Sequence, residues 1–334
     1  MNILVIRFSA LGDVALASIA VETILKANPS VNIWFLSKPF HEPLFNEDNR
    51  FQFIGADLKN KHKGLVGLRK LTKEILESTQ IDAVVDLHDV IRTKILLHFF
   101  RKKGIKVYSF SKGSKEKKNM LNGKIPFKKL THSVNRYLNC FQELGLNIAL
   151  KDGPWLKTDN KLNKPLNKKQ IGIAPFTAHK SKEWGFEKIT KLIEQLTHLD
   201  ILLFGGGENE IIQLNQLAEK FPNCKAIAGK YSLKEELDIM ANLDLMISMD
   251  SANMHLATLV GIKVISIWGP THHFLGFGPL MNEALIVEIN RKEMPCRPCS
   301  IYGKTSSSKQ EKCAKNAMKK ISVDTVLSKI NTAL

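Results

Sequence analysis

The chain has 334 residues, of which 44% are hydrophobic and 24% are charged, a composition typical of a globular protein with a buried core. This length suits two domains of ordinary size, and no apolar run reaches the roughly 20 residues that a membrane span requires. The net charge is +17, and the first 150 residues hold 24 lysines and arginines against 13 acidic residues, which indicates an acidic partner such as nucleic acid, anionic lipid or a phosphorylated substrate.

The N-terminal segment is apolar enough to resemble a signal peptide, but Arg7 lies inside the apolar run and Asp13 divides it. We therefore predict the first strand and helix of a cytoplasmic protein, at residues 2–7 and 13–26. Further strands are predicted at residues 32–37, 51–54, 82–87 and 107–110, with helices at 65–78 and 131–144 and another that ends at residue 100. The lysine-rich residues 111–129 show little apolar pattern, so we expect a mobile basic loop there.

The second half repeats this alternation after a polar stretch at residues 151–169, which we interpret as an interdomain linker. Strands are predicted at residues 171–176, 201–204, 226–227, 245–249 and 264–268, and helices at 186–196, 208–220 and 233–241. The tail from residue 291 is expected to be irregular until a final helix. The pattern predicts an α/β protein with doubly wound parallel sheets, divided into domains at residues 1–155 and 165–322 and a helix at 323–334. The carboxyl edges of the two sheets would enclose a cleft.

The loop after the first strand carries Ser9, Gly12 and Asp13. Gly12 permits a tight turn, and Asp13 begins a helix at the sheet edge where open α/β folds bind ligands. Asp13 could be a general base or an ordinary N-cap, and the local sequence favours neither. The G-x-G-x-x-G fingerprint is absent here, which argues against NAD or FAD.

Two loops of the second half could bind a nucleotide diphosphate. Lys180 and Lys182 follow a buried strand and could neutralise a pyrophosphate, with Thr177 donating a hydroxyl, or they could be a solvated charge pair. The glycines at residues 205–207 permit close backbone approach, and Glu208 or Glu210 could bind ribose hydroxyls or only stabilise a helix start.

Residues 244–271 predict a βαβ unit with two buried strands. Between the strands, Asp250 and Ser251 lead into a short helix that carries His255. The amides at the start of this helix would be unpaired donors suited to an anion. Equally, Asp250 or Ser251 could be only an N-cap and His255 only a core residue.

Five cysteines do not form an even disulfide framework. Cys296, Cys299 and Cys313 have part of the spacing of a zinc site, but no fourth ligand follows at the usual spacing. We expect reduced thiols in a cytosolic loop.

Taken in order along the chain, these motifs resemble glycosyltransferase family 9, the lipopolysaccharide heptosyltransferases, over nearly the whole length. The matching segments are Ser9-x-x-Gly12-Asp13, Asp86-Leu87-His88, His132-x-x-x-Arg136, Lys182-x-Trp184, the glycine-rich loop, Asp250-Ser251-x-x-x-His255 and Gly269-Pro270-Thr271.

The resemblance implies a GT-B fold of two Rossmann-like domains and the transfer of heptose from ADP-heptose to the inner core of lipopolysaccharide, with a phosphorylated, lipid A-linked acceptor and no cofactor or metal. We expect the transfer to invert the anomeric centre, with Asp13 as general base and Lys182 stabilising the leaving diphosphate. The expected donor-binding residues are Thr177, Lys180, Lys182, Gly206, Gly207, Glu210, Asp250, Ser251, Ala252 and His255. The expected acceptor-binding residues are Ser9, Gly12, Arg69, Arg92 and Arg136.

Ala252 departs from the family pattern, which usually has glycine there, and Arg7 stands where lysine is common. The basic N-terminal half also predicts peripheral contact with the anionic inner membrane. One alternative is a GT-B enzyme that uses another nucleotide sugar and another surface-glycan acceptor. A nucleic-acid-binding protein is disfavoured, because the sequence shows no aromatic–basic interleaving and no recognition motif.

Overall fold

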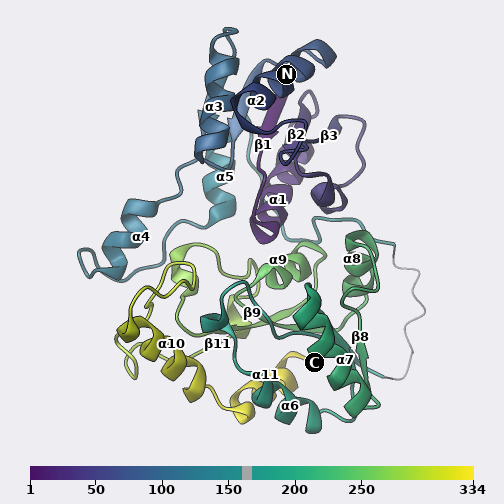
Figure 1. The fold of residues 1–334 in the computed structure, drawn as a ribbon, viewed down its shortest axis with the longest axis vertical. Helices are drawn as coiled ribbons and strands as arrows, with labels where there is room; N and C mark the ends of the chain where they lie inside the picture. Colours follow the sequence, from purple (N-terminus) through teal and green to yellow (C-terminus); the bar gives the residue numbers. More distant parts are fainter. Residues whose placement is uncertain (160–167) are drawn as a thin grey trace. The chain divides into compact units, whose positions relative to one another are not determined.

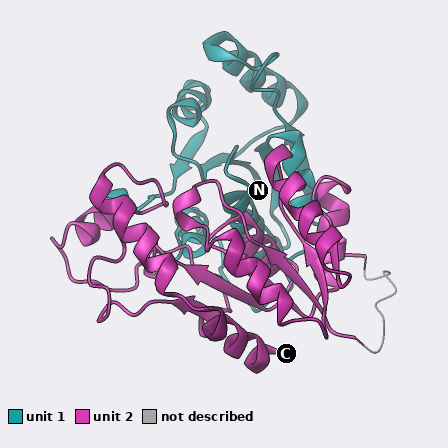
Figure 2. Cartoon of the chain, turned by 60° about the horizontal axis from the view of Figure 1, so that its bottom comes forward, with its two compact units in different colours: residues 1–114, 131–156 teal, residues 115–130, 157–334 magenta. Residues whose placement is uncertain are grey.

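The computed structural model describes residues 1–159 and 168–334, which divide into two compact units (Figure 2). Unit 1 consists of Met1–Ser114 and Thr131–Leu156, and unit 2 consists of Lys115–Leu130 and Lys157–Leu334. The domain boundary expected at residue 165 lies outside the described residues, as does part of the expected linker. The expected domain ranges stay a prediction.

Unit 1 contains a five-stranded parallel sheet in the order β3-β2-β1-β4-β5. Figure 1 labels its strands β1, β2 and β3. The strands are β1 (Asn2–Ile6), β2 (Asn32–Ser37), β3 (Phe51–Gly55), β4 (Ala83–Asp86) and β5 (Lys106–Ser109). The helices are α1 (Leu11–Ala27), the 3-10 helix η1 (Pro39–Leu44), α2 (Gly64–Ser78), α3 (Ile91–Arg101) and α5 (Ser133–Gln142). All of β4, and β1 after its first residue, are buried, as expected for parallel strands covered on both faces.

Unit 2 contains a six-stranded parallel sheet in the order β11-β10-β9-β6-β7-β8. The strands are β6 (Gln170–Ala174), β7 (Asp200–Leu203), β8 (Cys224–Ala226), β9 (Leu245–Met249), β10 (Val264–Trp268) and β11 (Ile286–Glu288). The α-helices are α4 (Ser114–Leu121), which belongs to this unit from Lys115 on, and α6 (Phe186–Glu194), α7 (Glu208–Lys220), α8 (Leu233–Ala241), α9 (Ala252–Leu259), α10 (Ser308–Lys320) and α11 (Val323–Ala333). Three short 3-10 helices are η2 (Lys180–Lys182), η3 (His273–Leu275) and η4 (Glu283–Leu285).

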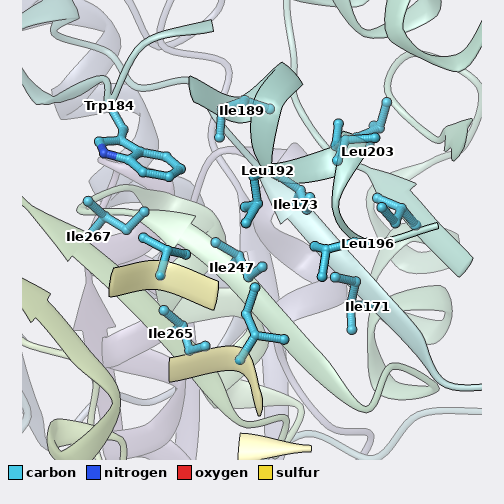
Figure 3. Close-up of a cluster of buried hydrophobic side chains, with 14 of the residues drawn as sticks. Ile171, Ile173, Trp184, Ile189, Leu192, Leu196, Leu203, Ile247, Ile265 and Ile267 are labelled. Atoms are coloured by element: carbon cyan, nitrogen blue, oxygen red, sulfur yellow. The ribbon is translucent and has the colours of Figure 1, made fainter. Parts of the chain in front are cut away.

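The core of unit 2 packs α6 and α11 against the sheet. Figure 3 shows Leu192 of α6 beside the sheet residues Ile173 and Ile247. Ile173 of β6 and Ile247 of β9 lie in one buried cluster with Leu192 of α6 and Ile330 of α11. Burial of one such side chain contributes about 1.5–3 kcal/mol. This apolar layer therefore fixes the central strands from whose ends the loops of the site project.

Residues 111–129 are more ordered than the mobile loop expected there, because they contain α4 (Ser114–Leu121). Met120 of α4 packs with Leu275, and the buried Lys117 places its ammonium 5.3 Å from the centre of the Phe277 ring. The lysine stem behaves as an apolar group in this position. The high lysine content of this segment therefore led to the prediction of a loop, although the segment contains a helix with one buried face.

The tail after residue 291 also differs from the irregular segment expected, because it contains α10. Ser307 caps this helix by accepting a hydrogen bond from the Gln310 N–H, and Cys313, Ala317 and Met318 bury one face.

At the other end of the chain, α1 begins two residues earlier than predicted. None of the helices in the described ranges combines the length and the apolar character that crossing a membrane requires.

Both sheets have a topological switch point, where the order of successive strands reverses. It lies between β1 and β4 in unit 1 and between β6 and β9 in unit 2. Loops leaving two such strands diverge to opposite faces of the sheet and leave a crevice, where open α/β sheets bind ligands. The fold thus selects the loops after these four strands as the candidate site.

Candidate active site

Arg7 and Asp13 form an ion pair at the switch point of unit 1. Arg7 Nη2 lies 2.7 Å from Asp13 Oδ2, and the same oxygen accepts a hydrogen bond from the Ala10 N–H at 3.2 Å. The Arg7 guanidinium is buried, donates to the Leu87 carbonyl and lies over the ring of Tyr137. The Asp13 side chain is 42% exposed. A buried arginine therefore fixes one oxygen of an accessible carboxylate.

His88, two residues after β4, reaches the same place. Its Nε2 lies 3.2 Å from Ser9 Oγ, and its loop is held by Asp86, whose Oδ1 accepts from the His88 N–H at 2.8 Å. The pKa of His88 is lowered to about 4, first by burial and then by the positive charges of Arg7 and Lys112. The imidazole is therefore neutral at pH 7.

Three of the expected acceptor-binding residues lie near one another. Ser9 and Gly12 belong to the loop and first turn that carry Asp13. Arg92, at the start of α3, is close enough for its charge to act on His88. Their roles toward an acceptor stay a prediction.

The other two expected acceptor-binding residues lie on separate helices of unit 1. Arg136, in α5, donates from Nε to the Thr131 carbonyl at 3.0 Å, and a Cβ on Gly113 would stand 2.8 Å from its guanidinium carbon. Arg69 is exposed on α2. Their acceptor roles also stay a prediction.

Lys182 and Asp250 form the corresponding ion pair in unit 2. Lys182 Nζ donates to the Asp250 carbonyl at 2.5 Å and lies 3.2 Å from Asp250 Oδ2. Thr271, after β10, donates its hydroxyl to the same Oδ2 at 2.7 Å. The side chains of Lys182 and Asp250 are only 12% and 7% exposed. The loops after β6, β9 and β10 therefore meet in one charged cluster.

Helix α9 begins directly after this cluster. Ser251 occupies the N-cap position but makes no side-chain cap hydrogen bond, and its Oγ lies 3.1 Å from Ser248 Oγ. The amides of Ala252 and the residue after it are thus not capped by Ser251, as an anion-binding helix start requires. His255 is buried in the same helix.

The loops after β6 and β7 bring two carboxylates together. Glu210, in the first turn of α7, accepts a hydrogen bond from the Gly206 N–H at 2.8 Å. The pKa of Glu183 is raised, first by burial and then by the negative charge of Glu210. Gly207, with φ +100°, is the N-cap of α7 beside them.

Thr177 and Lys180 are less closely tied to this cluster. The Thr177 hydroxyl donates to the His179 carbonyl at 2.7 Å, so it stabilises its own loop. Lys180 is exposed. Donor-binding roles for both residues stay a prediction.

Cys299 and Cys313 form a disulfide, so the expectation of reduced thiols is wrong for this pair. Cys296 is exposed and free, and its Sγ lies within 4.8 Å of the other two. The odd number of cysteines hid the pairing, because spacing does not reveal which cysteine remains free.

His272, His273 and Glu288 form a second group with the composition of a metal site. His272 Nδ1 accepts a hydrogen bond from the Phe274 N–H at 3.1 Å, so Nε2 carries the proton of the neutral ring. That nitrogen faces Glu288 Oε1 at 3.4 Å, and Arg297 Nη2 lies 3.1 Å from Glu288 Oε2. The group is an ion-pair and hydrogen-bond network rather than a ligand set.

His88 and Thr271 are site residues that were not among those predicted from the sequence. Both belong to motifs that the sequence displays, and both follow strands at or beside a switch point. The missing information was which strands are neighbours, since His88 meets Ser9 only because β4 pairs with β1.

Solved structures show the same fold over the whole chain. A glycosyltransferase of family 9 from Veillonella parvula has a TM-score of 0.74 at 19% identity and covers 99% of this chain and 96% of its own. The E. coli heptosyltransferase WaaC, solved with ADP, has a TM-score of 0.73 at 19% identity, with full coverage of both chains. Among curated proteins, lipooligosaccharide heptosyltransferase 2 of Campylobacter jejuni is 28% identical over 315 residues, which are 92% of this chain and 91% of that protein.

The two doubly wound units define a GT-B fold, the architecture of a large class of glycosyltransferases. A sequence profile of glycosyltransferase family 9 (heptosyltransferase) matches residues 68–305, and the chain belongs to this family. The matched range contains Lys182 and Asp250, whereas Asp13 lies before it.

Proposed function

We propose that the chain transfers a heptose from ADP-heptose to the inner core of lipopolysaccharide. Family membership over residues 68–305 carries this proposal. The names of its relatives support it, among them the lipopolysaccharide core heptosyltransferase OpsX of Haemophilus influenzae. The E. coli heptosyltransferase WaaC has been solved with ADP-2-deoxy-2-fluoro heptose, which supports an ADP-linked donor.

In this proposal unit 2 binds the donor. The Lys182 ammonium and the amides at the start of α9 receive the diphosphate, because both are positive groups at the switch point. The diphosphate carries more negative charge than the Asp250 carboxylate and competes with it for Lys182. Glu210 accepts hydrogen bonds from the ribose hydroxyls.

Unit 1 binds the acceptor and supplies the base. Asp13 removes the proton from the acceptor hydroxyl as that oxygen bonds to the anomeric carbon. The bond from the anomeric carbon to the diphosphate oxygen breaks, and ADP leaves with its electron pair, stabilised by Lys182. Arg7 and the Ala10 amide hold Asp13 Oδ2, so we assign proton removal to Oδ1.

The acceptor is a phosphorylated, lipid A-linked glycan, and the chain makes peripheral contact with the anionic inner membrane. The excess of lysine and arginine in the first 150 residues supports both proposals, because surface cations attract phosphates and anionic headgroups.

Replacing Asp13 with Ala should lower turnover by about 10²–10⁴-fold, the usual contribution of a general base, while calorimetry still detects ADP binding. Asp324→Ala is the matched control, since Asp324 also lies in a first helical turn, that of α11, and should leave turnover unchanged. Turnover near the wild-type value in Asp13→Ala would remove this residue from the mechanism.

Thermal-shift measurements with ADP-, UDP- and GDP-sugars test the donor, and only the ADP-sugar should stabilise the chain.

A further inference from the structure

The stem of Lys182 lies on a glycine from the C-terminal part of unit 2. A Cβ on Gly303 would stand 2.6 Å from Lys182 Cδ and 2.7 Å from Cγ, closer than real Cβ atoms approach other atoms. Gly303 is buried and has φ +94°, a conformation that favours glycine. The lysine stem therefore occupies the space that any side chain at position 303 would need.

Hydrogen bonds tie Gly303 to the neighbour of this lysine. Ser181 Oγ donates to the Gly303 carbonyl, and the Gly303 N–H donates to Ser300 Oγ at 3.0 Å. Ser300 in turn donates its hydroxyl to the Lys304 carbonyl at 2.7 Å. The backbone beneath the lysine is thus fixed on both sides of the glycine.

The same loop also supports the other half of the ion pair. The Cys299 N–H donates to the Pro270 carbonyl at 2.7 Å. Pro270 precedes Thr271, whose hydroxyl binds the Asp250 carboxylate. Residues 299–304 therefore contact Lys182 through Gly303 and, through Cys299, the loop that carries Thr271, although Gly303 is 121 positions from Lys182 in the sequence.

We propose that Gly303 is a positioning residue for the Lys182 ammonium, and that it sets the affinity of the site for the diphosphate of the donor. The inference rests on the proposed role of Lys182 in donor binding. A lysine side chain has many rotamers, and ordering it on ligand binding reduces affinity. Packing on Gly303 imposes that order before the ligand arrives.

The test compares the binding of ADP and adenosine to the full chain by titration calorimetry. Gly303→Ala should weaken ADP binding about tenfold, because the new methyl group displaces the lysine stem. Adenosine, which lacks phosphates, should bind as it does to the wild type. Lys182→Ala should weaken ADP binding at least as much, and the double variant should show no further loss than Lys182→Ala, since both changes act through one ammonium.

Gly185→Ala is the matched control for backbone strain. Gly185 has φ +107°, and a Cβ there would meet nothing within 4 Å, so this variant should bind ADP like the wild type. Ser181→Ala is a second, milder variant. It removes the hydrogen bond to the Gly303 carbonyl without adding atoms, and should weaken ADP binding several-fold.

This inference is overturned if Gly303→Ala and Ser181→Ala both bind ADP like the wild type while Lys182→Ala binds it clearly more weakly. That outcome leaves the proposed function intact. Wild-type affinity in Lys182→Ala would overturn the proposed donor site, and the inference with it. If circular dichroism shows that Gly303→Ala does not fold, the result for Ser181→Ala decides.

Discussion

Arg7 is a single residue whose charge acts on two chemically different neighbours, the Asp13 carboxylate and the His88 imidazole. Burial is the largest cause of the low His88 pKa of about 4, and the Arg7 charge comes second. Removing that charge while keeping a polar side chain should therefore raise the His88 pKa without restoring its ordinary value of 6.5.

We predict that Arg7→Gln raises the His88 pKa above 4 and leaves it below 6.5, as measured by an NMR titration of the imidazole protons. His41 serves as an internal control. Its pKa is also lowered to about 4, but by burial and then by the charge of Lys38, so it should not change. An unchanged His88 value would show that the guanidinium does not act on this ring.

Sequence alone could name residues such as Asp13 and Lys182, because each follows an apolar run that is typical of a buried parallel strand. It could not name their partners. Arg7 approaches His88 through the pairing of β1 with β4, and Lys182 meets Asp250 through the pairing of β6 with β9. Such contacts depend on strand order, which local patterns do not contain.

At the scale of elements, the alternation of strands and helices was predictable, and the two polar helices α4 and α10 were not. The buried face of α10 consists of small or flexible residues, Cys313, Ala314, Ala317 and Met318, which give a weak apolar signal. The spacing of Ser307 and Gln310 was the available clue, since a serine followed three residues later by glutamine is typical of a helix start.

The disulfide attaches α10 to the loop that contains Gly303. It joins positions 14 residues apart, and closing a loop of that length stabilises a fold by about 3 kcal/mol. We predict that Cys313→Ser lowers the free energy of unfolding by about this amount in urea titrations without reductant.

Cys296→Ser is the control, because Cys296 is exposed and unpaired, and it should unfold like the wild type. With dithiothreitol present, the wild type should lose the same stability as Cys313→Ser, since both then lack the crosslink. Equal stability of the wild type with and without reductant would contradict the prediction.

For the molecule as a whole, the two units repeat one plan. Each places an ion pair at the switch point of a parallel sheet, Arg7–Asp13 in unit 1 and Lys182–Asp250 in unit 2. The exposed carboxylate belongs to unit 1, whereas unit 2 offers a lysine whose side chain is only 12% exposed, beside a helix start. This difference supports assigning the base to one unit and the diphosphate site to the other.

The free energy of unfolding of the whole chain should depend on pH because of its buried histidines. Burial lowers the pKa of His41 to about 4 and that of His272 to about 3, below the 6.5 expected for the unfolded chain. As the pH falls below 6.5, the unfolded chain takes up protons on these rings before the folded chain does. The free energy of unfolding therefore decreases as the pH decreases from 6.5 toward 4.

We predict that His41→Gln reduces this pH dependence. His41 is 4% exposed, and its Nδ1 lies 2.8 Å from Ser37 Oγ, a contact that a glutamine amide can replace without titrating. The shift of the His41 pKa from 6.5 to about 4 corresponds to about 3 kcal/mol. In urea titrations, lowering the pH from 7 to 4 should reduce the free energy of unfolding of the wild type by up to about 3 kcal/mol more than that of the variant. Because the carboxylates titrate in both proteins, this difference reports on His41. Parallel curves for the two proteins would show that His41 takes up its proton equally in the folded and unfolded chains.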